Sequence, residues 1–289
     1  MATGDKLRLI LDLSVTNKYI KPEKFCLEDQ HLFFEFSKGE NYVAKFDIKS
    51  CYHQIPINQN SWTYLGFQWP LDGVNRYFVF KVLPFGLTSG PFICKKLFKP
   101  LVQKWRNSAI KIVLFFDDGA LCAKNFDLCN AQAKTVKLDL LKAHILPNAE
   151  KSDWIPKTVT NWLGYFWNYE NSSVSVSSTR TGKLFKKLYN FKQKFPLISA
   201  RLVAGIVGSL VSMNLVLEDK AVFLCRFLQI LVNHRHKNEI PWDRIIDFST
   251  VEGSVFACRE VDYLIHNFES LNVRKILERG STIQNNYFW

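Results

Sequence analysis

Two adjacent aspartates, Asp117 and Asp118, lie between two mainly apolar segments, residues 112–116 and 119–123. Asp-Gly between apolar segments predicts a β-hairpin, because these residues favour tight turns and both segments are apolar enough to be buried strands. Two carboxylates at a partly desolvated hairpin end repel each other unless a cation lies between them. An exposed turn is the alternative interpretation, since Asp and Gly are common in such turns.

A third carboxylate, Asp47, lies where a predicted strand at residues 41–48 ends. Carboxylates of this kind can hold two divalent ions about 3.5–4 Å apart, which can activate a hydroxyl and stabilise a leaving phosphate. Oxygen ligands suit Mg²⁺, and neither His nor Cys is needed. The three aspartates therefore indicate metal-dependent nucleotidyl transfer.

The positive charge of the chain is concentrated in its middle. The net charge is +12, yet residues 171–217 contain no Asp or Glu. A polyanionic partner would explain this excess, and an ordinary basic surface is the alternative. The basic residues of this segment are Arg180, Lys183, Lys186, Lys187, Lys192, Lys194 and Arg201.

Length and cysteine usage limit the class of protein. A chain of 289 residues allows one large domain or two. The seven cysteines form no C-x-x-C pair and follow no signal peptide, which predicts reduced thiols in an intracellular protein, cytoplasmic or nuclear. The uncharged run at 202–217 is shorter than the roughly 20 residues of a membrane span, so we expect a buried helix and no membrane segment.

Hydrophobic periodicity predicts an α+β fold that ends in helices. Strands are predicted at 7–13, 41–48, 63–67, 77–82 and 161–169, with the hairpin at 112–123 and helices from Ser89 and at 127–145. Further helices are predicted at 179–195, 200–217, 220–233 and 251–267. The polar stretch 171–178 predicts a domain boundary.

Five segments follow one another along the chain: Phe46–Ile55, Leu83–Pro91, Phe115–Asp118, Pro147–Lys151 and Trp162–Gly164. In this order they resemble successive motifs of a retroelement reverse transcriptase, and the resemblance covers residues 8 to about 235. It implies a right-hand polymerase with fingers and palm at 1–170, an antiparallel palm sheet and N-terminally short fingers. A basic helical thumb at 171–235 and a connection-like helical tail at 236–289, leading to an absent ribonuclease H, would follow.

The resemblance assigns the catalytic and metal-binding roles. Asp47 and Asp117 would bridge two Mg²⁺ ions, for which Mn²⁺ is a substitute, and Asp118 would be the less direct third ligand. Lys151 matches the lysine proposed to protonate the leaving pyrophosphate. A solvated lysine is the alternative for Lys151.

The resemblance also assigns contacts to the deoxynucleoside triphosphate (dNTP). Arg8 would grip the triphosphate, unless it is a rim arginine paired with an acid, and Lys6 is the candidate for a second phosphate contact. Tyr52 would lie under the sugar and exclude a 2′-hydroxyl, unless it is an ordinary core tyrosine. Phe85 and Gly86 would lie under the base.

An RNA or DNA template with its primer is the implied macromolecular partner. Residues Trp162, Leu163 and Gly164 match the primer grip, although buried packing explains the first two equally well. The thumb residues Lys183, Lys186 and Lys187 would hold duplex phosphates with little sequence preference.

Within the family, the motif combination resembles DIRS-type, tyrosine-recombinase retrotransposons. Phe115 stands where many members have tyrosine. Ribonuclease H and recombinase functions would come from elsewhere. The predicted function is an RNA-directed DNA polymerase. The alternatives are a truncated or domesticated remnant that binds nucleic acid without polymerising, an RNA-dependent RNA polymerase, which Tyr52 disfavours, and a structural subunit.

Overall fold

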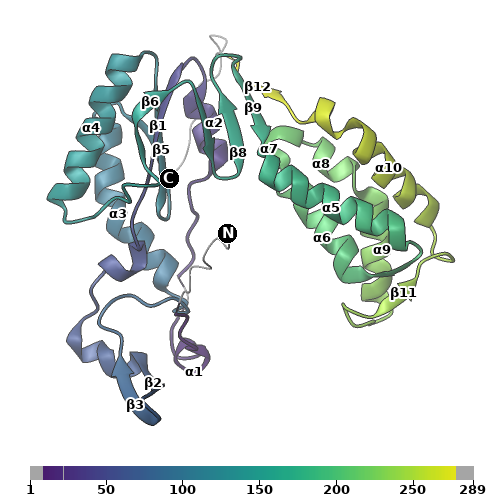
Figure 1. Ribbon diagram of the computed structural model, residues 1–289, viewed down its shortest axis with the longest axis horizontal. Coiled ribbons are helices and arrows are strands. Elements are labelled where there is room, and N and C mark those ends of the chain that lie inside the picture. Colours follow the sequence, from purple (N-terminus) through teal and green to yellow (C-terminus); the bar gives the residue numbers. More distant parts are fainter. Residues whose placement is uncertain (1–8, 22, 278–289) are drawn as a thin grey trace. The chain divides into compact units, whose positions relative to one another are not determined.

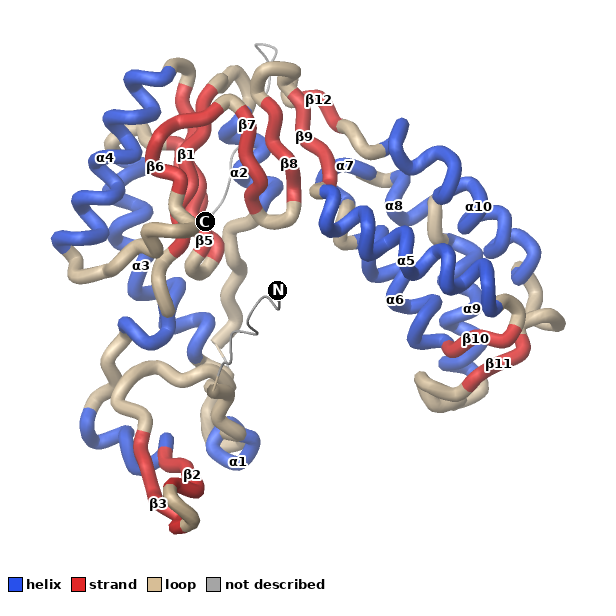
Figure 2. Tube along the Cα trace, in the orientation of Figure 1, coloured by secondary structure: helices blue, strands red, loops and turns tan. Residues whose placement is uncertain are grey.

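The computed structural model of the protein describes residues 9–21 and 23–277. The chain divides into two compact units between Lys157 and Thr158. Figure 1 labels their elements, and Figure 2 distinguishes helices from strands.

The first unit mixes short and long helices with two antiparallel sheets. Its helices are α1 (Ser14–Asn17), α2 (Gln30–Ser37), α3 (Gly90–Asn107) and α4 (Phe126–Lys142), with 3₁₀-helices η1 (Cys51–Gln54) and η2 (Gln59–Leu65). Its strands are β1 (Tyr42–Asp47), β2 (Gly66–Leu71), β3 (Val74–Val79), β4 (Lys111–Phe115), β5 (Asp118–Ala123) and β6 (Asp153–Lys157).

The central sheet of this unit has the strand order β4-β5-β1-β6, and its paired strands run antiparallel. β5 is buried along almost its whole length, as expected for an apolar strand with neighbours on both sides. The core joins the sheet to α3 and α4, and Phe46 of β1 stacks on Trp154 and meets Trp105 of α3 edge-on. The core therefore fixes the strand ends that carry the aspartates.

The hairpin at the two aspartates exists, but its turn lies earlier than the sequence predicts. Phe115 pairs with Asp118, so the turn residues are Phe116 and Asp117. Gly119 lies inside β5, where an added Cβ would come within 2.2 Å of the Phe46 ring. The glycine is thus required for close packing against Phe46 and not for the turn.

The second unit combines a four-stranded sheet with a helical bundle. Its strands are β7 (Val159–Trp162), β8 (Tyr165–Asn168), β9 (Ser173–Val176), β10 (Leu197–Ser199), β11 (Ile245–Asp247) and β12 (Arg274–Lys275). Its helices are α5 (Ser178–Lys194), α6 (Ala200–Val211), α7 (Asn214–Leu217), α8 (Lys220–Phe223), α9 (Arg226–Lys237) and α10 (Ser254–Leu271). The sheet order is β12-β9-β8-β7, and β10 pairs with β11.

Several predicted elements differ from the structure. Residues 9–13, the described part of the strand predicted at 7–13, form only one isolated bridge, from Ile10 to Phe85. The strand pair predicted at 63–67 and 77–82 is present as β2 and β3, but with shifted bounds. β2 begins only at Gly66, since Thr63 and Leu65 belong to η2, and β3 ends at Val79. The single strand predicted at 161–169 is a hairpin of β7 and β8.

The division into units also differs from the predicted boundary at residues 170 and 171. β8 pairs with β7 on one side and on the other with β9, which forms inside the polar stretch predicted as a domain boundary, so β7 and β8 belong to the second unit. α10 packs on α5 and α9, so the described part of the predicted tail shares one unit with the helices predicted as the thumb. Among the described residues, no helix is both long and apolar enough to span a bilayer.

Candidate active site

The three aspartates meet at one end of the central sheet. Asp47, the last residue of β1, is the register partner of Asp118, the first residue of β5. Asp117 precedes β5 in the turn, and its backbone carbonyl accepts a hydrogen bond from the Ile48 N–H at 2.7 Å. Antiparallel pairing thus brings together residues that are about 70 positions apart in the sequence.

The turn that presents Asp117 is strained. Phe116 has a φ of +53°, a left-handed conformation that bulky residues rarely adopt. Phe116 is also the first central residue of a two-residue hairpin loop, where glycine is the usual choice. Strain of this kind costs about 1–3 kcal/mol and persists only where the surrounding structure imposes it.

Negative charge accumulates at Asp118. Burial, as the largest cause, and the charges of Asp117 and Asp47 together raise the pKa of the Asp118 carboxyl to about 6, against the opposing charges of Lys151 and Lys45. The nearby lysines therefore do not fully offset the carboxylates, and a cation at this sheet end would be stabilised.

Lys151 lies directly at the aspartates. Its Nζ is 3.2 Å from Oδ2 of Asp47, whose side chain is 9% exposed, and Lys151 itself is largely exposed. The preceding turn is tied to the end of β1, because the Asn148 N–H donates to the Asp47 carbonyl at 2.7 Å. The Asp47 N–H in turn donates to Ser152 Oγ at 3.1 Å. This turn therefore positions Lys151 beside Asp47.

The donor set fits a hard divalent ion in its chemistry, since carboxylate oxygens suit Mg²⁺. In the described part of the chain, however, no group of three or more His, Cys, Asp or Glu residues is arranged closely enough to hold a metal by itself. Oδ2 of Asp47 is also paired with Lys151. Binding would require local adjustment of these side chains, with bound nucleotide or water supplying further ligands.

Tyr52 and Phe85, both predicted to contact the nucleotide, lie against each other. Their rings stack with centroids 5.0 Å apart. Gly90, at the start of α3, leaves room for this arrangement, since an added Cβ would lie 2.8 Å from the Tyr52 ring. Burial, as the largest cause, raises the pKa of the Tyr52 hydroxyl to about 12, so the side chain is neutral at physiological pH.

The loop that carries Phe85 and Gly86 is held by residues 11–17. Gly86 has a φ of +103°, and an added Cβ would lie 2.2 Å from the Leu11 carbonyl oxygen. Asn17 donates from Nδ2 to the Gly86 carbonyl and accepts from the Thr88 N–H, each at 2.9 Å. The sequence prediction missed Asn17, which no motif distinguishes from other polar residues at a helix end.

The remaining nucleotide contacts predicted from the sequence, Arg8 and Lys6, lie outside the described residues. Their assigned roles stay predictions.

In the second unit, the predicted primer grip is a tight turn. Leu163 and Gly164 link β7 to β8 with φ values of +47° and +78°. Trp162 is 4% exposed, which agrees with buried packing. Arg180 of α5 covers the turn: its Cδ would lie 2.5 Å from a Cβ on Gly164, and its guanidinium lies over the Tyr165 ring.

The three predicted thumb lysines differ in their surroundings. Lys183 and Lys186 are exposed on α5. Lys187 instead donates hydrogen bonds to the Gly205 carbonyl and to Ser209 Oγ of α6, each at 2.8 Å. Lys187 thus joins two helices, while its neighbours are free to meet a ligand from solution.

The fold is that of a right-hand polymerase. The structure of the foamy viral protease-reverse transcriptase dRH in complex with ds DNA matches with a TM-score of 0.70 at 16% identity, over 97% of this chain and 44% of that one. The foamy viral protease-reverse transcriptase in complex with RNA/DNA hybrid matches with a TM-score of 0.65 at 17% identity, over 89% and 32%.

Residues 3–166, more than half of the chain, match the family described as reverse transcriptase (RNA-dependent DNA polymerase). The chain belongs to this family.

Sequence relatives are polyproteins of viruses and transposons. The genome polyprotein of Petunia vein clearing virus (isolate Shepherd) is 29% identical over 42% of this chain and 5% of its own length. The putative enzymatic polyprotein of Cassava vein mosaic virus is 24% identical over 67% and 28%. The transposon Tf2-3 polyprotein of Schizosaccharomyces pombe is 26% identical over 55% and 11%. The chain therefore spans less than a third of the length of these relatives.

Proposed function

We propose that the protein is an RNA-directed DNA polymerase that extends a primer with deoxynucleotides. The observation that carries this proposal is the convergence of Asp47, Asp117 and Asp118 at one sheet end, in a chain of the reverse transcriptase family. The raised pKa of Asp118 supports a cation-binding role, because it reflects burial of the carboxyl, as the largest cause, beside the negative charges of Asp117 and Asp47.

The aspartates hold the metal ions in this proposal. Asp47 and Asp117 would hold two Mg²⁺ ions, or Mn²⁺ as a substitute, and Asp118 would be the less direct third carboxylate. Bound Mg²⁺ supplies Lewis-acid activation of the primer 3′-hydroxyl and neutralises charge on the phosphates. Lys151 gives a proton to the leaving pyrophosphate, for which its exposed Nζ beside Asp47 is well placed.

The stacked rings select and position the nucleotide. Tyr52 lies under the sugar and rejects a 2′-hydroxyl by collision, while Phe85 and Gly86 lie under the base. The stacking of Tyr52 on Phe85 supports a single rigid platform for both tasks. Arg8 and Lys6 contact the triphosphate.

The nucleic acid partner is an RNA or DNA template with its primer. Lys183 and Lys186 contact duplex phosphates, and their exposure supports this role. The turn Trp162–Gly164 contacts the primer. The solved relatives with DNA and with RNA/DNA hybrid agree with such a partner.

The finer assignments rest on the sequence. The motif combination supports a DIRS-type retroelement as the source. All seven cysteines lie in the described part of the chain and are free thiols, which supports a reducing compartment, cytoplasmic or nuclear.

Primer extension on an RNA template with dNTPs and Mg²⁺ tests the proposal, with Asp117→Asn as the matched control. We expect extension by the wild type and none by the variant, while both bind primer–template in a mobility-shift assay. Binding without extension by the wild type would overturn the polymerase assignment in favour of a nucleic-acid-binding remnant. Absence of binding would favour a structural subunit.

A comparison of ribonucleotides with deoxynucleotides separates the proposal from an RNA-dependent RNA polymerase. We expect the wild type to incorporate deoxynucleotides preferentially. Tyr52→Ala should narrow that preference because it removes the ring under the sugar. Equal use of both nucleotides by the wild type would contradict the role of Tyr52.

A further inference from the structure

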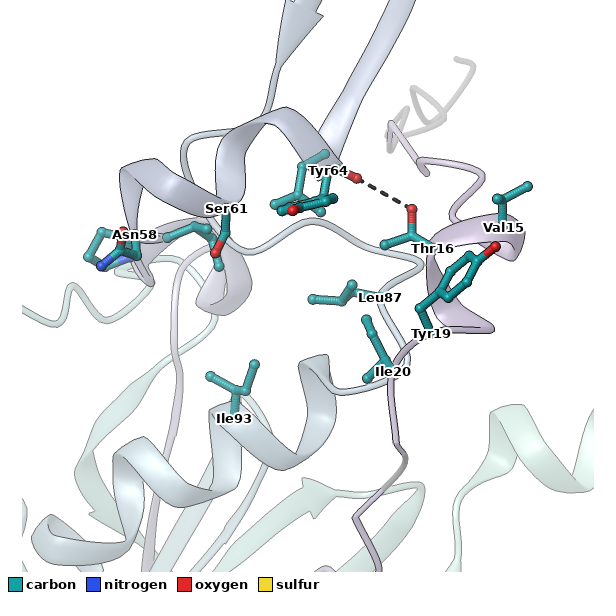
Figure 3. Close-up of a pocket in the computed structure, with 12 residues that line it drawn as sticks. Val15, Thr16, Tyr19, Ile20, Asn58, Ser61, Tyr64, Leu87 and Ile93 are labelled. Atoms are coloured by element: carbon teal, nitrogen blue, oxygen red, sulfur yellow. Dashed lines mark hydrogen bonds between the residues drawn. The ribbon is translucent and has the colours of Figure 1, made fainter.

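A cavity of about 730 Å³ lies within the first unit, and none of the three aspartates lines it. It is bounded by α1 and the residues after it, by η2 and its preceding segment, by the loop at Leu87 and by the start of α3. Figure 3 shows Leu87, Ile20 and Ile93 directed into the same space from three of these segments. Its volume falls in the range of about 300–1,000 Å³ that is common for small-molecule sites.

The lining indicates the chemistry of an occupant. Among the described residues, no acidic, basic or histidine side chain lines the cavity. A charged ligand would lose its hydration there without an ionic partner, so the occupant is uncharged. Polar groups are few: Asn58 and Ser61 lie on the η2 side, and the Thr16 hydroxyl donates to the Tyr64 carbonyl at 3.4 Å.

Two tyrosines at the cavity favour an aromatic occupant. The side chains of Tyr19 and Tyr64 are 86% and 69% exposed, although both residues line the cavity. An aromatic ligand would cover part of this apolar surface and could meet the rings in an offset or edge-on arrangement. The driving force for binding is then the burial of apolar area from both partners.

The cavity is connected to the nucleotide platform by two routes. Leu87, which lines the cavity, follows Gly86 in the loop that bears Phe85. Asn17 holds this loop through Gly86 and Thr88, and it belongs to α1, which supplies Val15 and Thr16 to the cavity wall. A ligand that displaces α1 or Leu87 would therefore shift the platform under the base.

We propose that this cavity binds an uncharged aromatic small molecule, and that its occupation slows nucleotide incorporation without competition from the nucleotide. The binding part stands on the cavity alone. The effect on incorporation rests on the proposed polymerase function.

Fluorescence titration of the full chain with the uncharged dye Nile red tests binding. Ser61→Trp fills the cavity and should lower the affinity of saturable dye binding at least about tenfold, the effect of losing roughly 1.4 kcal/mol of apolar contact. Tyr77→Ser is the matched control, because Tyr77 is 83% exposed on the aromatic β2–β3 hairpin, another exposed apolar surface on which the dye could bind. We expect unchanged binding in this control.

Circular dichroism melting curves of both variants show whether each folds. If Ser61→Trp is unfolded, Ile93→Trp replaces it, since Ile93 enters the cavity from α3. Equal binding by a folded cavity-filling variant, or loss of binding in Tyr77→Ser, would overturn the assignment. Displacement of the dye by a single-stranded oligonucleotide would also overturn it, in favour of an unpaired template base as the occupant.

Initial rates of primer extension at several dye and dNTP concentrations test the second part. We expect Nile red to lower the maximal rate of the wild type, and saturating dNTP should not restore it. Ser61→Trp should resist this inhibition. Full relief by dNTP would refute a separate site. A chain that binds the dye and does not extend primers would refute the polymerase function and leave the binding site intact.

Discussion

The aspartate end of the first unit and the basic surface of the second handle charge in opposite ways. Asp47, Asp117 and Asp118 concentrate like charges where burial already disfavours them, as the raised pKa of Asp118 shows. The second unit spreads positive charge over exposed helix surfaces, and several of its basic groups have partners, such as Arg274 with Glu218 at 2.9 Å. The proposed catalytic site thus retains local instability, whereas the proposed binding surface is built at little cost to folding.

This contrast predicts different responses to substitution. Charges at the aspartates act together on one reacting group, so the loss of one disables the site. Charges on the helices act separately on a polyanion, so each loss weakens binding by a small step.

The largest expected effect is that of Asp47→Asn on primer extension. We expect the rate to fall by about a thousandfold, the scale for loss of one electrostatic stabiliser of a transition state. Asp47 is the register partner of Asp118 and the neighbour of Lys151, so the substitution removes one of the three carboxylates at this sheet end. Single-turnover extension measures the effect. A fall in the extension rate of less than tenfold, in protein with an unchanged melting temperature, would contradict the expected difference between the aspartates and the basic helices.

Gly86→Ala should come next, because both its φ of +103° and the Leu11 carbonyl oppose a side chain. We expect the free energy of unfolding to fall by about 1–3 kcal/mol and the KM for dNTP to rise more than kcat falls. Gly73→Ala is the matched control, since Gly73 also has a positive φ, +76°, but no atom within 4 Å of an added Cβ.

Gly73→Ala should cost only about 1 kcal/mol and leave the KM for dNTP unchanged. Urea unfolding and steady-state kinetics separate the two variants. Similar kinetics for both would show that the loop at Gly86 does not position the nucleotide.

Asp118→Asn should stabilise the fold while it reduces activity. The pKa of Asp118 is raised from 3.8 to about 6, so the folded state binds the proton more tightly than the unfolded state does. The ionised Asp118 carboxyl therefore lowers the free energy of unfolding. This destabilisation is complete above about pH 6, shrinks as the pH falls, and vanishes below about pH 4. After allowance for solvent screening we expect a gain of about 1 kcal/mol at pH 7.5.

Urea unfolding of wild type and Asp118→Asn at pH 7.5 and pH 4 measures this gain as a difference, in which other titrating groups cancel. A gain of equal size at both values would show that the carboxyl does not carry the penalty.

The smallest effects are expected on the basic surface. Lys186→Ala should weaken primer–template binding about threefold, because one exposed phosphate contact is lost. The salt slope, which is the steepness of the logarithm of the binding constant against the logarithm of salt concentration, should fall by about 1. Lys187→Ala is its neighbour control. It should instead lower stability by about 1 kcal/mol, since it removes the hydrogen bonds to Gly205 and Ser209.

Fluorescence anisotropy at several salt concentrations, with thermal melting, distinguishes the two lysines. An unchanged salt slope in Lys186→Ala would contradict its contact with phosphate.

Local patterns predicted part of the site correctly. Apolar runs around Asp117 and Asp118 predicted the hairpin, because a short run of consecutive apolar residues is typical of a buried strand. The position of its turn was not predictable from Asp-Gly, since Gly119 is required by the Phe46 ring of another strand. Asn17 was missed for a similar reason: its partners are about 70 residues away.

Helical spacing likewise predicted most of the second unit but not its boundary. β9 lies in a polar stretch where only the alternation of Val174 and Val176 with serines indicates a strand, and it forms because β8 and β12 offer it partners. The unit boundary follows from this pairing, because β7 and β8 form one sheet with β9 and so belong to the second unit.

The sequence by itself determined the family, the three carboxylates and the basic helical segment, because these depend on residue types and their order. Only the tertiary structure decided that Asp47 pairs in register with Asp118, that Lys187 joins two helices while Lys186 stays exposed, and that a cavity adjoins the loop of Phe85 and Gly86. These features depend on contacts between distant residues. Such contacts form only when hydrophobic burial brings the elements together.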